Sequence, residues 1–386
     1  MSILPRVFQH AWMDADIESF REQVRRYVER ELTPHVPAWR AQGYIPRETW
    51  RGFGEHGFLL PEMDEQWGGG GGNLAYQLVV QEELTKAEIH GSTSVHTIAS
   101  HYIKTYGTDE QKQRWLPKLC SGEMLAGIAM TEPGVGSDLK AMTSRAQRDG
   151  DHYVINGSKT FITNGYTANL LVVALRTGDA GSSGVSLMVL ETENLPGFRV
   201  GRRLHKIGQH ISDTAELFFE DLRIPVTQLL GGTEGQGFKQ LIGQLGYERT
   251  LLAVSAATAI EMAVELTVDY TQQRKAFGQT IADFQNTRFK LAECATTAHV
   301  VRSFVNDCIQ RLLDGTLENE AAYMAKWWCS EQQCKVMDEC LQLFGGYGFM
   351  EEYPIARMYT DARIQKIYGG TNEIMKDLIA RRLFAR

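Results

Sequence analysis

The stretch Ile128–Ala141, IAMTEPGVGSDLKA, joins a short apolar run to a glycine-rich turn. The apolar residues predict a short buried strand, and Pro133, Gly134 and Gly136 predict the turn that leaves it. Glycine lets the main chain approach a ligand closely, and N–H groups in a turn suit an anion such as a phosphate. No third glycine follows at the spacing of a dinucleotide fingerprint, and no βαβ unit surrounds the stretch. Taken alone, it is at least as well interpreted as an ordinary turn after a strand.

Around this stretch the sequence changes from helical to strand-like and back. Asp14 or Asp16 is expected to cap the first of the helices that amphipathic spacing predicts at 14–32, 47–57, 73–89, 92–106 and 109–119. Turn clusters such as Asn156-Gly157-Ser158 separate short β-type runs at 153–155, 170–175, 185–190 and 215–219. Helical patterns then return at about 238–270, 284–313, 318–344 and 352–367, and from Thr371 onward.

The order of these elements predicts an α+β protein of three parts. Strands this close together, without helices between them, favour an antiparallel sheet or a small barrel. A chain of 386 residues also exceeds what one hydrophobic core usually serves. We therefore expect an N-terminal α-helical domain at 1–122, a middle antiparallel β domain at 123–235 and a C-terminal four-helix bundle at 236–386.

Composition and charge exclude several classes of protein. Hydrophobic residues make up 43% of the chain and charged residues 23%, as in ordinary globular proteins. The net charge of −7 argues against a general nucleic-acid binder, and the basic cluster of Arg202, Arg203 and Lys206 is interpreted as a solvated face. No apolar run reaches the length of a membrane span, and the N-terminus has neither a signal-peptide nor a transit-peptide pattern. We expect a cytoplasmic protein.

The cysteines and histidines do not form a metal-binding pattern. The chain has no CxxC pair and no HExxH motif, and His96 and His101 would lie on different faces of one helix. Core thiols are the expected state of the six cysteines at 120, 294, 308, 329, 334 and 340. The sequence predicts no metal site.

Glu248 interrupts an otherwise apolar helix. Positions 238, 241, 245, 252, 256, 259, 263, 266 and 270 step by threes and fours and form an apolar stripe, with Glu248 in its middle. A carboxylate on such a stripe is costly unless it is paired or faces a cavity. Two interpretations stay open: a buried ion pair, with Arg249 or another arginine, and a functional acid or base.

Several motifs in the chain carry a family resemblance. Besides Thr131–Asp138, TEPGVGSD, they are Lys159–Gly165, KTFITNG; Gln273–Gly278, QRKAFG; Gln342–Phe349, QLFGGYGF, followed by Asp361; and Tyr368–Ile374, YGGTNEI. Together they resemble the acyl-CoA dehydrogenase family, which carries T-E-P-x-x-G-S-D at the first position. The resemblance covers nearly the whole chain and is greatest to the long-chain branch. It implies the same order of helices, strands and helices.

The resemblance implies a bound FAD between the sheet and the C-terminal helices. It places Met130 and Thr131 at the flavin ring, Phe161 and Thr163 on the other face of the ring, and Ser137 near the pyrophosphate. Many relatives have tryptophan where this chain has Phe161. Further contacts to FAD are implied at Gln285, Gly345, Thr371 and Glu373.

The same resemblance implies an assembly of several copies. Arg274, Phe277, Gln342 and Gly346 would reach the FAD of a neighbouring subunit, so a homo-oligomer, expected to be a tetramer, follows. A guanidinium suits a pyrophosphate, and an aromatic side chain suits an apolar ring system.

The family reaction removes two hydrogens from a fatty acyl-CoA thioester and passes the electrons to an electron-transferring flavoprotein. Many relatives carry the catalytic glutamate where this chain has Gly369, whereas the long-chain and isovaleryl branches carry it at the position of Glu248. The resemblance therefore assigns the base to Glu248, leaves space beside it at Gly369, and offers the Gly369 N–H to the thioester oxygen. Substrate contacts are implied at Ser137, Arg249, Tyr368 and Gly370.

Two other functions remain open at this point. An acyl-CoA oxidase on the same fold would return electrons to oxygen, although such oxidases are usually much longer than 386 residues. A non-catalytic acyl-CoA-binding relative is suggested by Gly369 alone.

Overall fold

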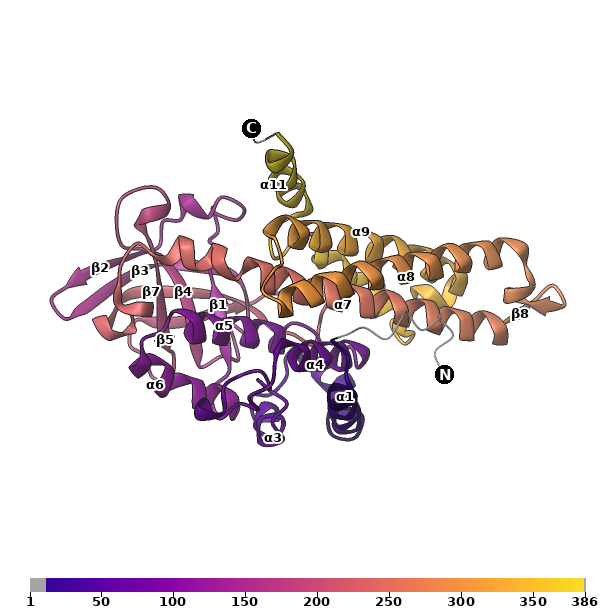
Figure 1. Cartoon of the computed structure of the whole chain (residues 1–386), viewed down its shortest axis with the longest axis horizontal. Coiled ribbons are helices and arrows are strands. Elements are labelled where there is room, and N and C mark those ends of the chain that lie inside the picture. The colour runs from indigo at the N-terminus through magenta and orange to yellow at the C-terminus, as the bar shows by residue number, and fades with distance from the viewer. Residues whose placement is uncertain (1–11, 385–386) are drawn as a thin grey trace.

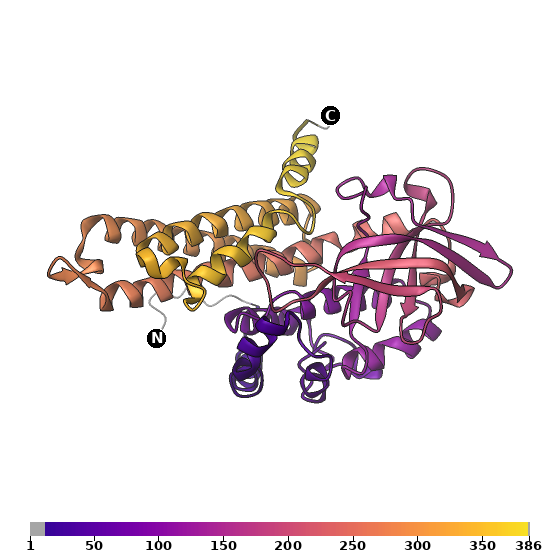
Figure 2. The same cartoon turned by 180° about the vertical axis from the view of Figure 1, so that it is seen from behind.

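The computed structural model describes residues 12–384. Residues 1–11, which hold most of the N-terminal segment used for the cytoplasmic expectation, and residues 385–386 lie outside the described part. The molecule is elongated: a β sheet lies at one end, a long helical bundle extends to the other, and the N-terminal helices cover one side of their junction (Figures 1 and 2). The α+β architecture expected from the sequence is confirmed.

The N-terminal part is entirely helical apart from its loops. Asp14 caps the first helix, since its side chain accepts a hydrogen bond from the Ile17 N–H at 2.8 Å, and a π-helical turn at Val28–Leu32 prolongs that helix. A helix at Val36–Gln42 was not predicted. The helices are α1 Ala15–Tyr27, α2 Val36–Gln42, α3 Thr49–Glu55, α4 Leu74–Lys86, α5 Ser92–Tyr106 and α6 Asp109–Cys120.

The sheet contains seven strands in the order β1-β4-β2-β3-β7-β6, with β5 paired to β4. Most neighbours are antiparallel, as expected, but β1 runs parallel to β4, and β2 touches β4 in parallel at one point. The strands are β1 Ala126–Ala129, β2 Arg145–Asp149, β3 His152–Thr163, β4 Leu170–Arg176, β5 Val185–Glu191, β6 Phe198–Arg203 and β7 Thr214–Pro225.

The predicted turn at Asn156–Ser158 is wrong, because β3 runs straight through it. The register shifts between Ile155 and Gly157, which is a β-bulge. Gly157 has a φ of +144°, and a Cβ there would lie 2.4 Å from the Ser144 hydroxyl oxygen, so the bulge requires glycine. Glycine is needed at this position because β3 passes close to Ser144, and not because the chain reverses direction.

Strand β4 is buried on both faces and joins two cores. Leu170, Val172 and Ala174 pack into a cluster shared with the N-terminal helices and the bundle. Leu171, Val173 and Leu175 face the opposite way, into a core shared with β3 and β7. Because successive side chains of a strand point to opposite faces, one continuous apolar run serves both cores.

The C-terminal part is a bundle of long helices. Its elements are α7 Gly237–Gln273, α8 Gln285–Leu313, α9 Asn319–Phe344, α10 Pro354–Ala362 and α11 Asn372–Phe384, with a small hairpin of β8 Lys275–Ala276 and β9 Gln279–Thr280 at the far tip. The helix predicted at 352–367 is shorter, because α10 gives way to a 3₁₀ turn at Arg363–Lys366. Helices α7, α8 and α9 lie side by side along the long axis (Figure 1).

Helix α7 is enclosed over its central part, where nearly every residue from 247 to 260 is buried. It packs against α4, α5, α8, α9 and α10, so the single apolar stripe of the prediction is too narrow a description. Contrary to the expectation, α7 is by length and composition alone apolar enough to cross a membrane; 61% of its most apolar 18-residue window is buried in the protein. A core helix of a soluble protein passes the same test.

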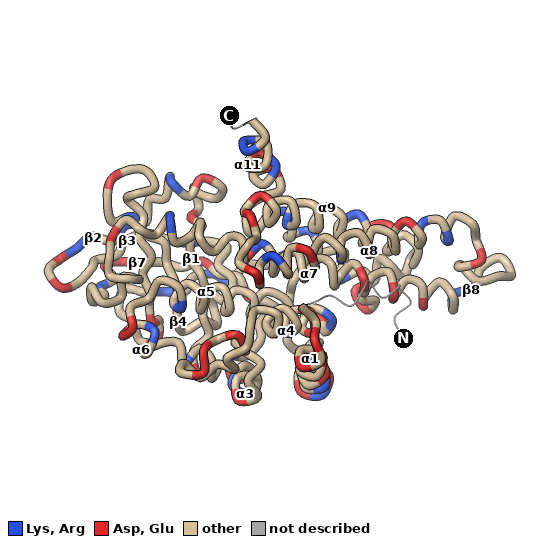
Figure 3. The backbone as a smooth tube through the Cα atoms, in the orientation of Figure 1, with Lys and Arg blue, Asp and Glu red and all other residues tan. Residues whose placement is uncertain are grey.

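A buried ionic network ties the first part to the bundle. Glu82 on α4 accepts from Arg21 on α1 and from Arg302 on α8, each at 2.6 Å. Arg302 also bonds Glu261 on α7. Other charged residues of both signs are spread along the backbone, in the helices and in the segments around the sheet (Figure 3). Burial alone would raise the pKa of Glu82, but Arg302 and Arg21 outweigh it and lower the pKa to about 2.

We predict that Glu82→Gln lowers the free energy of unfolding by about 3–5 kcal/mol, because it leaves two guanidinium groups without their shared partner. Since the folded pKa lies below the unfolded one, this stabilisation is complete above about pH 4.5 and is lost as the pH falls toward 2. Thermal melts of wild type and variant from pH 7 to pH 3 should therefore draw closer together toward the acid end.

The matched control is Glu22→Gln, which removes an exposed carboxylate from a pair with Arg25 and Arg26. Its melting temperature should equal that of the wild type, because exposed ion pairs contribute little. Equal melting temperatures for Glu82→Gln and Glu22→Gln at pH 7 would contradict the account of the network.

Candidate active site

The turn Thr131–Asp138 after β1, called the signature turn below, is held in place by the buried carboxylate of Glu132. Glu132 and Val135 exchange two backbone hydrogen bonds and close the turn. The Glu132 side chain accepts the N–H groups of Thr143 and Ser144 at 2.7 and 3.0 Å and the Lys159 ammonium at 2.8 Å. Burial alone would raise the pKa of Glu132, but these donors outweigh it and lower the pKa to about 2.

Lys159 and its neighbour connect β3 to the residues predicted at the cofactor. The buried Lys159 ammonium also donates to the Met130 carbonyl at 3.0 Å, and the Thr160 N–H donates to the Thr131 carbonyl at 2.9 Å. Met130 and Thr131 are thus held at their backbones while their side chains stay half-buried. Ser137 is exposed on the same turn.

Phe161 projects from the end of β3 onto the surface. Its backbone adopts a φ of +58°, which is rare for a bulky residue, and 68% of the residue is exposed. Thr163, two residues further on, is half-buried. A large exposed ring held by an unfavourable backbone conformation suggests a binding surface for an apolar partner.

Glu248 is buried, but its partner is not the one considered from the sequence. Tyr102 on α5 donates its hydroxyl to Glu248 Oε1 at 2.7 Å. Within residues 12–384, no arginine or lysine approaches the Glu248 carboxylate within ion-pair distance. Burial raises the pKa of Glu248, while the Tyr102 hydrogen bond and the charge of Arg249 act in the opposite direction. The ion-pair interpretation is therefore wrong. Glu248 is a desolvated carboxylate whose hydrogen-bond donor is a neutral hydroxyl.

The loop at Tyr368–Thr371 lies against the same part of α7. Arg249 donates from Nε to the Gly369 carbonyl at 3.4 Å, and Lys326 on α9 donates to the Gly370 carbonyl at 2.6 Å. Arg249 also lies 4.5 Å from the centre of the Tyr323 ring. Burial lowers the pKa of Lys326 to about 8. Two buried cations thus fix this loop by its carbonyl groups.

The expectation of empty space beside Gly369 is wrong. A Cβ at Gly369 would lie 2.5 Å from Leu252 Cδ1, and the φ of +64° disfavours any other residue. Leu252 lies one helical turn after Glu248 on α7 and fills the space that a side chain at 369 would need. The Gly369 main chain can therefore approach α7 closely, which a larger residue would prevent.

The start of α11 holds two more of the residues predicted near the cofactor. Thr371 accepts the Ile374 N–H on its hydroxyl at 3.3 Å and so helps to begin the helix. Glu373 is exposed in the first turn of α11.

The remaining predicted residues lie elsewhere, at the far tip of the bundle. They surround the β8–β9 hairpin, which is at the opposite end of the molecule from the sheet (Figure 1). Phe277 is 94% exposed at a φ of +51°. Arg274 lies 5.4 Å from the centre of the Tyr347 ring, and Gln285, Gln342, Gly345 and Gly346 are exposed. One chain does not bring this group to Thr131.

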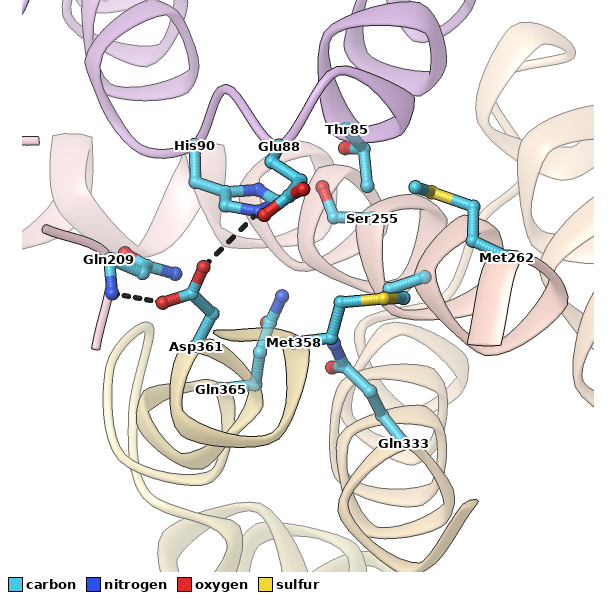
Figure 4. Close-up of a pocket in the computed structure, with 11 residues that line it drawn as sticks. Thr85, Glu88, His90, Gln209, Ser255, Met262, Gln333, Met358, Asp361 and Gln365 are labelled. Carbon is cyan, nitrogen blue, oxygen red and sulfur yellow. Dashed lines mark hydrogen bonds and ion pairs between the residues drawn. The ribbon is translucent and has the colours of Figure 1, made fainter. Parts of the chain in front are cut away.

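Asp361, which belongs to one of the motifs, has a structural position. It pairs with Arg40 at 3.2 Å. It also accepts the Gln209 N–H and lies 3.7 Å from His90 (Figure 4). These contacts join α10 to α2, to the loop after β6 and to the α4–α5 loop. The cavity beside them measures about 20 Å³, which is room for about one water molecule. It is too small for a substrate.

Two further expectations about charged and polar residues need correction. Lys206 is not on a solvated face: it donates to the Ser212 carbonyl and to the Thr214 hydroxyl, and burial lowers its pKa to about 8. Arg203 lies over the rings of Tyr44 and Tyr166, at 5.4 and 5.5 Å. Arg202 is exposed, as expected.

His96 belongs to the core. Its ring bonds the Leu119 carbonyl and the Ala126 N–H, and burial lowers its pKa to about 4. No group of three or more potential metal ligands occurs in the described part of the chain. All six cysteines are free, and five of them are buried.

Sequence reasoning missed the residues that support the site. Tyr102, Lys326 and Glu132 were not singled out, although Glu132 lies inside the signature motif. Tyr102 and Lys326 look like ordinary members of helices, and only long-range packing reveals their partners. A lysine inside the apolar pattern of α9 was the one available signal.

Comparisons with known proteins agree over almost the whole chain. Three family descriptions match in order: the acyl-CoA dehydrogenase N-terminal domain at 14–123, the middle domain at 127–222 and the C-terminal domain at 235–384. The long-chain specific acyl-CoA dehydrogenase of Sus scrofa mitochondria is 46% identical over 369 residues, which are 94% of this chain and 85% of that protein.

Solved structures show the same similarity. An acyl-CoA dehydrogenase from Geobacillus kaustophilus is 45% identical, with a TM-score of 0.95 over 98% of this chain and 100% of the other. A glutaryl-CoA dehydrogenase from Mycobacterium smegmatis in complex with FADH2 is 27% identical, with a TM-score of 0.90 over 97% of this chain and 96% of the other.

We predict that Lys159→Met lowers the free energy of unfolding by about 3–5 kcal/mol, because it leaves the Glu132 carboxylate without its buried cation. Chemical unfolding at pH 7 measures the change. Lys239→Met, at an exposed position on α7, is the control and should leave stability unchanged. If the two variants are equally stable, the Lys159–Glu132 pair does not hold the signature turn.

Proposed function

The chain belongs to the acyl-CoA dehydrogenase family, and from this premise we propose that it oxidises a fatty acyl-CoA thioester to the trans-2-enoyl-CoA and passes the electrons to an electron-transferring flavoprotein. One observation carries the proposal: α7 holds a buried carboxylate, Glu248, next in sequence to Arg249, which donates to the Gly369 carbonyl. The similarity to a long-chain enzyme supports a fatty acyl group as the substrate.

Glu248 is proposed as the base that takes the α-proton of the substrate. The α-carbon loses its C–H bond, a new O–H bond forms at Glu248, and the electron pair becomes part of the new double bond. Burial raises the pKa of Glu248, and a base with a pKa nearer the working pH is more effective. Arg249 and Leu252, three residues apart on α7, both lie against the Gly369 loop, so the geometry supports a substrate bound at the edge of this contact.

The Gly369 N–H is proposed to bind the thioester oxygen. A fixed donor at this atom stabilises the negative charge that develops when the α-proton leaves. Arg249 and Lys326 occupy the carbonyl groups of the loop, and Tyr368 and Gly370 flank the donor. Ser137, exposed on the signature turn, is proposed as a further substrate contact.

The residues present fit a bound FAD. A Cβ at Gly134, Gly136, Gly345 or Gly346 would meet nothing within 4 Å, so each of these backbones borders open space. Met130, Thr131, Phe161 and Thr163 would hold the flavin ring, with Thr371 and Glu373 near the same junction. FAD supplies the acceptor for the two electrons that leave the β-carbon as hydride.

A neighbouring copy is proposed to complete the cofactor site. Arg274, Phe277, Gln285, Gln342, Gly345 and Gly346 gather at the bundle tip, far from Thr131, and their exposure supports a contact with another subunit. A homotetramer would place the tip of one copy at the sheet of another.

We predict that the purified protein is yellow and that anaerobic addition of a fatty acyl-CoA bleaches the flavin. In Glu248→Gln, flavin and substrate should still bind, but flavin reduction should slow by roughly 10²–10⁴-fold, the usual contribution of a positioned base. Asp269→Asn, at an exposed carboxylate on the same helix, should reduce flavin at the wild-type rate.

Two outcomes would contradict parts of this assignment. Flavin reduction by Glu248→Gln at the wild-type rate would make Glu248 a structural acid, with Glu373 the next candidate for the base. Rapid re-colouring of the bleached wild-type protein in air would indicate an oxidase. A series of acyl chain lengths, followed by kcat/KM, identifies the preferred substrate.

We predict that Arg274→Ala loses FAD and dissociates the oligomer together, because one guanidinium would serve both. Acid release of the flavin identifies it as FAD or FMN, and a sizing column reports the assembly. Arg148→Ala, an exposed arginine on β2, is the control. A variant that keeps its flavin and its size would contradict the cross-subunit arrangement.

A further inference from the structure

Tyr102 joins the N-terminal helices to the proposed base. The residue has no exposed surface, and its hydroxyl donates to Glu248 Oε1 at 2.7 Å. Its ring lies 6.3 Å from that of Tyr106, one turn further along α5. The hydroxyl is therefore fixed in place by the packing of α5 against α7.

We propose that Tyr102 is a positioning residue for Glu248: it holds one carboxylate oxygen on α5 so that the other oxygen is presented to the substrate at the Gly369 loop. The inference rests on the proposed function, because it takes Glu248 to be the base. Tyr102 itself would contact neither the substrate nor the cofactor.

The hydrogen-bonding chemistry of Tyr102 and Glu248 allows the tyrosine to hold one carboxylate oxygen while the other stays free. A carboxylate has two oxygens that accept hydrogen bonds, whereas a phenol has one O–H to donate. Burial raises the pKa of Tyr102 well above its usual value, so the hydroxyl stays protonated and remains a donor. When the free oxygen of Glu248 takes the α-proton, Oε1 can keep the Tyr102 hydrogen bond as a carbonyl-type acceptor.

Without this bond, the glutamate would lose both its orientation and part of its charge stabilisation. The side chain of glutamate rotates about three bonds, and a misplaced base loses much of its effect. The charged groups on the neighbouring elements bond to other partners and so do little to replace the Tyr102 hydrogen bond. Arg249 on α7 turns toward Gly369 and Tyr323, while Glu62 and His101 bond each other behind Tyr247.

The pH dependence of kcat/KM separates positioning from a merely structural bond. Because the Tyr102 hydrogen bond favours the charged form of Glu248, its removal should raise the pKa of the base further. In Tyr102→Phe, the acid limb of the kcat/KM profile should move up by about one to two pH units, the usual effect of one hydrogen bond to a buried charge.

The experiment uses the holoenzyme and a fatty acyl-CoA, with flavin content and melting temperature measured for each variant. Tyr106→Phe is the matched control: it removes a hydroxyl from the next turn of α5, where the hydroxyl lies near Gln244 and not Glu248. An acid limb of Tyr102→Phe that coincides with that of Tyr106→Phe overturns the proposal, even if the melting temperature falls.

Two additional measurements keep the test decisive. Tyr102→Phe added to Glu248→Gln should slow flavin reduction less than about twofold further, because a positioning residue acts only through the base; a full second loss overturns the proposal.

If Tyr102→Phe does not fold, incorporation of 3-fluorotyrosine at position 102 keeps the shape and strengthens the donor. The acid limb should then move to lower pH, and an unmoved limb overturns the proposal.

The failure of this inference can be told apart from failure of the proposed function. Wild-type flavin reduction by Glu248→Gln removes the base assignment itself. Slow reduction by Glu248→Gln, together with an unmoved acid limb in Tyr102→Phe, removes only the role of Tyr102.

Discussion

A carboxylate within the core of a long helix has to be stabilised by its surroundings, and for Glu248 the packing of α5 against α7 meets that requirement. Glu248 sits where α7 crosses α5, with the Tyr102 hydroxyl as its hydrogen-bond donor and Arg249 directed away toward Gly369. A full ion pair would hold the carboxylate charged but would lower its pKa, whereas a single neutral donor leaves it desolvated and basic. This environment raises the pKa of Glu248, as the proposed base requires.

Buried charged groups also hold two loops of the candidate site. The signature turn is held by Glu132 and Lys159 from beneath, and the Gly369 loop by Arg249 and Lys326 from behind. In both cases buried charged groups bind backbone atoms and leave the exposed side of the loop free. The ionic network of Glu82 and Arg302 joins the N-terminal helices α1 and α4 to α7 and α8 of the bundle.

The sequence predicts the fold and an acid on the apolar stripe of α7, but not the residues that contact that acid. The helices have strong periodicity and β4 and β5 are largely apolar runs, whereas β2 and β6 are short and largely polar and gave no signal. Glu248 could be found because it interrupts an apolar pattern, and Gly369 because it stands in a motif. Tyr102 lies 146 residues from Glu248, and a tyrosine in an apolar helix looks like any core aromatic. Leu252 filled a space that the sequence had suggested was empty, because a neighbouring side chain cannot be placed by spacing alone.

The central claim is that Glu248 removes the α-proton, and hydrogen exchange tests that step without the hydride step. The chemically reduced enzyme cannot accept a hydride, so incubation with a fatty acyl-CoA in D2O reports only removal and return of α-hydrogens, followed by mass spectrometry. The account predicts α-deuteration by the wild type, and α-deuteration slowed by roughly 10²–10⁴-fold in Glu248→Gln. Deuteration by Glu248→Gln at the wild-type rate would contradict it.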